Sequence, residues 1–91
     1  MKNKFDMSKF NTLYDTAFRS IVIGERETAA GHLAKSYRSL DKAYRCLTQL
    51  TTLVGYADGF DRGACRRKIE IIRCRLYEAL DERLTALNHQ N

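Results

Sequence analysis

Hydrophobic residues recur along this chain at intervals of three, four and seven positions, the spacing that places them on one face of an α-helix. The clearest example is a seven-residue row made by Leu33, Leu40, Leu47 and Val54. Alongside it, the stretch 37–40 (Tyr-Arg-Ser-Leu) returns as 44–47 (Tyr-Arg-Cys-Leu). The repeat predicts a helix with an apolar face, tyrosines beside that face and cations on the opposite side.

The same pattern predicts three helices, at about 8–23, 28–54 and 61–87. Gly24 and Gly55 are expected to end the first two, and Thr28 is expected to cap the second. Asp6 or Ser8 is the expected cap of the first helix, and Asp58 or Asp61 that of the third. The predicted fold is all-α, a short N-terminal helix packed on a long antiparallel helical hairpin. This three-helix bundle forms a single helical domain over residues 1–91, and its dimerisation is left open.

Composition places the chain among ordinary globular proteins, with 44% hydrophobic and 30% charged residues. The longest apolar run, 21–23, is far shorter than the roughly 20 residues of a membrane span. The N-terminus has no apolar segment of the kind found in secretion signals. Three cysteines, an odd number without paired spacing, favour free thiols in a reducing compartment. We therefore expect a cytoplasmic protein without a membrane partner.

The net charge of +5 comes from 16 cations and 11 anions, which favours phosphates or an acidic protein surface as partner. Four cations on the second helix are spaced three, four and three residues apart, so they stack on the side away from the leucine row. They are Lys35, Arg38, Lys42 and Arg45. The row is about 15 Å long. Asp41 alone lies close enough on that helix to neutralise part of it.

The third helix has its charges placed against the helix macrodipole. Its first two turns hold four cations and its later turns three acids: Arg62, Arg66, Arg67 and Lys68, then Glu78, Asp81 and Glu82. Either the cations form an anion-binding surface, or the negative end of the second helix holds them.

Catalytic and metal-binding signatures are absent from the sequence. Cys65 and Cys74 are nine residues apart, and no cysteine pair has the spacing of a zinc site, so the cysteines are expected to be buried small hydrophobic residues. Cys65 lies beside cations near a helix N-terminus, so its thiolate is expected to be favoured. His32 and His89 have no nucleophile at a meaningful spacing. We therefore expect no enzyme activity, no metal and no cofactor.

The surfaces then predict a small helical binding protein that acts stoichiometrically, as an inhibitor or adaptor, on a larger protein or protein–nucleic-acid complex with an acidic surface. Tyrosine and arginine dominate binding hot spots, so Tyr44 and Tyr77 are the expected anchors. The expected contact residues are Lys35, Arg38, Lys42, Arg45, Tyr44, Arg66, Arg67, Arg73 and Tyr77. Two alternatives stay open: a nucleic-acid-binding module of low sequence specificity, and a structural or chaperone-type homodimer that uses its apolar seam.

Overall fold

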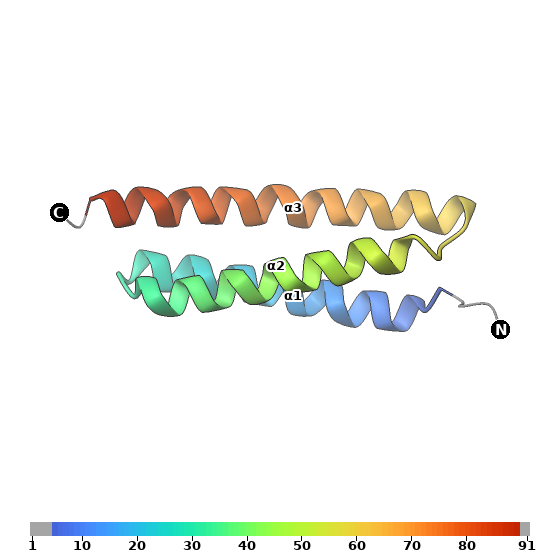
Figure 1. Ribbon diagram of the computed structural model, residues 1–91, viewed down its shortest axis with the longest axis horizontal. Helices are drawn as coiled ribbons and strands as arrows, with labels where there is room; N and C mark the ends of the chain where they lie inside the picture. The colour runs from blue at the N-terminus through green and yellow to red at the C-terminus, as the bar shows by residue number, and fades with distance from the viewer. Residues whose placement is uncertain (1–4, 90–91) are drawn as a thin grey trace.

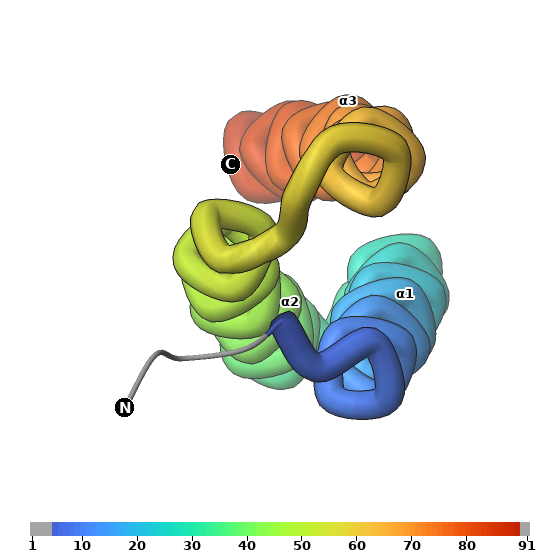
Figure 2. Tube along the Cα trace, turned by 90° about the vertical axis from the view of Figure 1, so that its right-hand side faces the viewer, coloured from blue at the N-terminus to red at the C-terminus, as the bar shows by residue number. Residues whose placement is uncertain are grey.

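The computed structural model describes residues 5–89, which form three helices and no strand. These are α1 (Met7–Ala29), α2 (Leu33–Val54) and α3 (Gly59–Asn88). The chain reverses at two short connections, so the three helices lie side by side, and α3 projects past the α1–α2 turn (Figure 1). Seen along the bundle, their axes occupy the corners of a triangle (Figure 2). The predicted all-α helical bundle is confirmed.

The core lies along the axis of the bundle, where the apolar faces of all three helices meet. The seven-residue row of α2 belongs to it, with each member less than a tenth exposed. The large side chains that are fully buried come from every helix: Phe10 and Ile21 of α1, Leu40 and Leu50 of α2, and Ile72 and Leu76 of α3. Burial of such side chains stabilises the fold by about 1.5–3 kcal/mol each.

The first helix is longer than predicted, because Gly24 does not end it. α1 continues to Ala29 and has 23 residues, against 22 in α2, so the N-terminal helix is not short. Gly24 lies where α1 packs closely against Leu40 of α2. A Cβ atom at this position would be 2.5 Å from Cδ2 of Leu40. The glycine therefore serves close helix packing, whereas its place after a hydrophobic run predicted a helix end.

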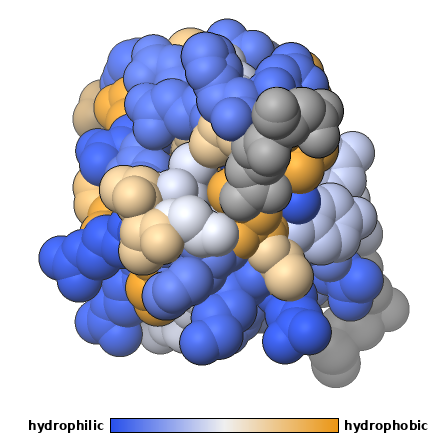
Figure 3. Space-filling view, turned by 90° about the vertical axis from the view of Figure 1, so that its left-hand side faces the viewer, coloured by the Kyte–Doolittle hydropathy of each residue, from blue (hydrophilic) through white to orange (hydrophobic). Residues whose placement is uncertain are grey.

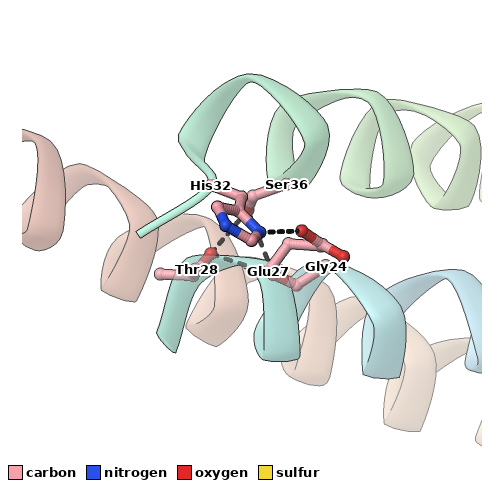
Figure 4. A network of polar contacts seen from close by, with 5 residues as sticks. All are labelled: Gly24, Glu27, Thr28, His32 and Ser36. Atoms are coloured by element: carbon pink, nitrogen blue, oxygen red, sulfur yellow. Dashed lines mark hydrogen bonds and ion pairs between the residues drawn. The ribbon is translucent and has the colours of Figure 1, made fainter. Parts of the chain in front are cut away.

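The α1–α2 turn is held by hydroxyl groups (Figure 4). Thr28, predicted to cap the second helix, lies inside α1, and its hydroxyl lies 2.9 Å from the carbonyl oxygen of Gly24. The hydroxyl of Ser36, a fully buried residue of α2, lies 3.1 Å from the same carbonyl and also contacts Thr28. Each hydroxyl has one proton, so one donates to the carbonyl and the other to its neighbouring oxygen. The turn itself uses Gly31 at φ +82°, a conformation that glycine adopts without steric cost.

The other helix ends follow the sequence more closely. Asp6 caps α1, since its side chain accepts a hydrogen bond from the backbone N–H of Lys9. α2 ends at Val54 as predicted, but it begins at Leu33, with His32 at the N-cap position. α3 begins two residues before the predicted start, with Asp58 at its N-cap position.

Two cations of α3 stack on aromatic rings of α1. Lys68 lies 5.6 Å from the ring centroid of Tyr14, and Arg75 lies 5.1 Å from that of Phe18. Arg75 also donates two hydrogen bonds to Glu25, and this contact raises the pKa of the guanidinium. These contacts join α3 to α1 outside the apolar core.

No helix in the described part of the chain has the length and apolarity that crossing a membrane requires. Figure 3 shows the end of the bundle at which α3 stops, where hydrophilic residues form most of the rim and a few hydrophobic residues show near the middle. On α3, Leu84 and Leu87 remain about half exposed. Apolar surface is therefore available on α3 beyond what the core uses.

Candidate partner-binding surface

The four predicted cations of α2 are all exposed, on the side of the helix opposite its buried residues. They are Lys35, Arg38, Lys42 and Arg45, and we call them the α2 row. Arg45 forms an ion pair of 3.1 Å with Asp41, as the sequence suggested. The other three form no ion pair within residues 5–89. The row therefore presents positive charge to solvent that its own chain neutralises only at one position.

A shallow groove runs between α2 and α3 and brings together three of the predicted contact residues. Tyr44 contributes from α2, and Arg73 and Tyr77 contribute from α3. Both tyrosines are about half exposed, at 51% and 54%. The remaining lining residues all belong to α2: Leu47, Thr48, Thr51 and Thr52. The rings can contact a partner here without any change in the core.

The threonine side chains of this groove use their hydroxyl protons inside α2. The hydroxyls of Thr48, Thr51 and Thr52 each donate to a backbone carbonyl four residues earlier, at 2.9–3.2 Å. Their hydroxyl protons are thus used within α2, so these side chains offer the groove methyl groups and hydroxyl oxygens that can only accept hydrogen bonds. Arg73 is paired with Glu70, so its charge is partly neutralised. The groove consequently combines aromatic rings and methyl groups with hydrogen-bond acceptors, and it has little free charge.

The other predicted contact residues, Arg66 and Arg67, lie apart from the α2 row. Both are exposed near the start of α3. Arg83 stacks on Tyr37, and this contact fixes how α3 is aligned with α2. With that alignment, Arg66 is level with the end of α2, about 13 Å along the axis from Arg45. The structure thus separates the predicted contact set into the α2 row, the groove and this arginine pair.

Four cations of α3 stabilise the fold, and two of them, Arg62 and Lys68, are among those that the sequence placed on a positive surface. Arg62 donates to the carbonyl oxygens of Ala57 and Gly55 in the α2–α3 connection. Arg83 donates to the carbonyl of Leu33 while it stacks on Tyr37. Lys68 and Arg75 stack on rings of α1. The sequence did contain a signal for the stacking of Lys68 and Arg75. These two residues are seven apart, which places both on one flank of α3.

The cysteines differ from expectation in two ways. Cys65 is 1% exposed, and burial raises the pKa of its thiol, so the prediction of a favoured thiolate was wrong. The nearby cation Lys68 acts in the opposite direction but is the weaker effect. Cys74, expected to be buried, is exposed, because it lies nine residues from Cys65 and thus on the opposite side of α3.

Among the described residues, no group of three or more histidine, cysteine, aspartate or glutamate side chains is placed to hold a metal ion. Comparison of the chain with protein-family models gives no match, and comparisons with curated proteins and with solved structures give none either. The function of this three-helix bundle is therefore inferred from its surfaces.

Proposed function

We propose that this protein is a non-enzymatic binding protein that acts stoichiometrically, as an inhibitor or adaptor, on a larger protein or protein–nucleic-acid complex with an acidic surface. The observation that supports this proposal is the exposure of the α2 row beside the tyrosine-lined groove. Four cations follow one helix, and three of them have no acidic partner among the described residues. Tyr44 and Tyr77 add aromatic area next to that charge.

The α2 row supplies attraction and the groove supplies contact area. An acidic surface is drawn toward the row, since opposite charges raise the rate of encounter. Once docked, partner side chains pack against the half-exposed rings, where burial contributes more free energy than exposed ion pairs do. The partner is thereby occluded or bridged without chemical change. Arg66 and Arg67 belong to the predicted contact set, but their distance from the row gives them a secondary part.

The first test uses poly-L-glutamate as the probe of an acidic protein surface. Fluorescently labelled protein is titrated with it, and binding is followed by anisotropy. Wild type is compared with the variant Arg38→Glu/Lys42→Glu. Each substitution replaces an attraction by a repulsion, and an exposed ion pair contributes about 0.2–1 kcal/mol, so affinity should fall about tenfold.

The matched control is Lys9→Glu/Arg19→Glu, which makes the same change of net charge on exposed positions of α1. It should bind poly-L-glutamate with no more than a twofold to threefold decrease in affinity. Equal decreases in the two variants would show that only net charge matters, and the α2 row would then lose its assigned role.

A second candidate, a nucleic-acid-binding module of low sequence specificity, is favoured by the regular spacing of the α2 row. A row of about 15 Å meets two or three phosphates. The discriminating measurement is binding to short duplex DNA and RNA between about 50 and 200 mM salt, because counterion release gives phosphate binding a steep salt dependence. Saturable binding at the upper salt concentration, abolished by reversal of all four cations of the row, would replace the first proposal.

A further inference from the structure

The outward face of α3 carries apolar residues that the core does not use. Ile71 is 57% exposed, and Cys74, one turn further along, is also exposed. They line a shallow hollow whose other residues are Glu70, Arg75 and Glu78. A single exposed apolar residue is ordinary in a folded protein, but here the residues on the two sides of Cys74 follow a symmetric order in the sequence.

The residues on either side of Cys74 mirror one another. From 70 to 78 the sequence is Glu-Ile-Ile-Arg-Cys-Arg-Leu-Tyr-Glu, which presents the same residue classes in both directions. Ile72 and Leu76, two residues away on each side, are fully buried. Ile71 and Tyr77, three residues away, are both more than half exposed. The outward face of α3 therefore has approximate twofold symmetry about Cys74.

The two arginines next to Cys74 do not charge this face strongly. Arg73 turns toward the α2–α3 groove and pairs with Glu70. Arg75 turns toward α1, where it pairs with Glu25 and stacks on Phe18. The centre of the face is left to the thiol and the apolar side chains.

Beyond this centre the symmetry becomes one of opposite charge. Arg66 and Arg67 lie eight and seven residues before Cys74, and Asp81 and Glu82 lie seven and eight residues after it. All four side chains belong to exposed residues. None of them forms an ion pair inside the described range 5–89. All four lie more than one turn from either end of α3, so the helix dipole gives the isolated helix no stabilisation from them.

We propose that the outward face of α3 pairs antiparallel with the same face of a second copy of this chain, about a twofold axis at Cys74. Residues equally far in sequence from Cys74, on opposite sides of it, then lie at the same level along the two helices. Arg67 and Asp81 lie only about 20° around the helix from Cys74, so each faces the other residue in the second copy, about 10 Å from the axis. Arg66 and Glu82 lie on the two flanks, about 80° from Cys74, where Arg66 is nearest to Asp81 of the second copy and Glu82 is nearest to its Arg67. The twofold axis produces each contact twice. The hollow lined by Glu78, Asp81, Glu82 and Thr85 receives the arginine side chains.

A second copy fits this face better than a partner of one charge. A purely acidic partner would be attracted by Arg66 and Arg67 but repelled by Asp81 and Glu82. A basic partner would be attracted by the two acids and repelled by the two arginines. The unfavourable contact is that of Glu70 with Glu78, four residues on each side of the axis. Arg73 beside Glu70 and Arg75 near Glu78 reduce that repulsion.

The paired surface spans about 24 Å of helix, from Arg66 to Glu82. Much of its specificity comes from exposed charges, so the dimer should be weak and should dissociate as salt screens those charges. The α2 row lies outside this surface, although Tyr77, Arg66 and Arg67 belong to both proposals. The α2 row is tested by binding of poly-L-glutamate and the paired surface by self-association, so failure of one proposal can be distinguished from failure of the other.

The test exchanges the charges in two variants. Arg66→Glu/Arg67→Glu makes both ends of the face acidic, and Asp81→Lys/Glu82→Lys makes both ends basic. In sedimentation experiments each variant alone should be monomeric at concentrations where wild type dimerises, with dissociation constants raised at least tenfold. An equimolar mixture should form a one-to-one dimer, because each contact then joins opposite charges again.

Arg38→Glu/Lys42→Glu serves as the control, since it lowers the net charge as much as Arg66→Glu/Arg67→Glu does but lies on α2. It should dimerise as wild type does, and circular dichroism establishes that every variant is folded. A wild type that stays monomeric at about 100 μM would overturn the proposal, since its dissociation constant would then be millimolar or weaker. So would a dimer that both charge variants retain.

Crosslinking locates the axis. Mild oxidation with diamide, which takes up the two electrons and two protons released by a pair of thiols, should join two wild-type chains through Cys74. The buried Cys46 and Cys65 are inaccessible to it. Absence of the crosslinked dimer in Cys74→Ser and in Arg66→Glu/Arg67→Glu is the expected result. Equal crosslinking of wild type and Arg66→Glu/Arg67→Glu would indicate random collision and contradict the pairing.

Discussion

Replacement of Gly24 by alanine tests the way in which the two N-terminal helices meet. Alanine is normally preferred in a helix interior by about 1 kcal/mol over glycine. Here the new Cβ would lie 2.5 Å from Cδ2 and 2.7 Å from Cγ of Leu40, whereas carbon atoms prefer about 3.5–4.0 Å. Leu40 is completely buried among the other side chains of the core, which restrict its movement. Steric overlap should therefore exceed the gain in helix propensity.

The magnitude follows from these two opposing effects. Overpacking of a buried site costs about 1–3 kcal/mol, and severe overlap lies toward the upper part of that range. After the propensity gain is subtracted, Gly24→Ala should lower the free energy of unfolding by about 1–2 kcal/mol. Gly63 is the matched control, because its added Cβ would find no atom nearer than 3.8 Å. Gly63→Ala should raise stability by about 0.5–1 kcal/mol.

Urea denaturation followed by far-UV circular dichroism measures both changes. A double-mutant cycle with Leu40→Ala isolates the overlap, since Leu40→Ala removes the atoms that the new Cβ would meet. In that background Gly24→Ala should become neutral or stabilising. If Gly24→Ala stabilises the wild type as much as Gly63→Ala does, the proposed close approach of α1 and α2 at Gly24 is wrong.

Three further results are expected. Ser36→Ala should lower the free energy of unfolding by about 1 kcal/mol, because it removes a buried hydrogen bond, whereas Ser39→Ala should change it by less than about 0.5 kcal/mol. In the folded protein a thiol reagent should modify Cys74 rapidly, and Cys46 and Cys65 only after denaturation. Burial raises the pKa of the thiols of Cys46 and Cys65 in the folded protein. As pH rises, these thiols therefore lose their protons in the unfolded chain before they do in the folded one. Stability measured by denaturation should therefore fall as pH rises above about 8.5, and less so when both are replaced by alanine.

The sequence was sufficient to predict the helical class and most of the apolar face of α2, because seven-residue spacing depends only on helix geometry. The row from Leu33 to Val54 is buried as expected. Exposure of the four cations opposite that row follows from the same geometry.

The end of the first helix could not be read in this way. A glycine after a hydrophobic run has the same local sequence whether it ends a helix or allows a neighbouring helix to pack closely. The difference at Gly24 depends on Leu40, 16 residues later, whose side chain occupies the space of a missing Cβ. Likewise, Thr28 resembles a helix cap in the local sequence. Its side chain instead contacts Ser36, which belongs to the next helix and which the local sequence does not identify as a partner.

The candidate site was only partly predictable for a related reason. Sequence identifies a cation, but the structure decides what surrounds it. Arg83 and Arg75 stack on rings and form hydrogen bonds, while Arg66 and Arg67 form no ion pair within the described part of the chain. The grouping of Tyr44, Arg73 and Tyr77 required the alignment of α2 with α3, which the sequence did not provide.

The most direct test of the proposed function maps the bound surface residue by residue. ¹⁵N-labelled protein is titrated with poly-L-glutamate, and amide chemical shifts are recorded at about 150 mM salt. We expect the perturbed amides to lie along α2 from Lys35 to Arg45 and beside the groove at Tyr44 and Tyr77. Perturbations confined to Arg66 and Arg67, or spread evenly over the exposed cations of all three helices, would contradict the proposal that the α2 row is the binding surface.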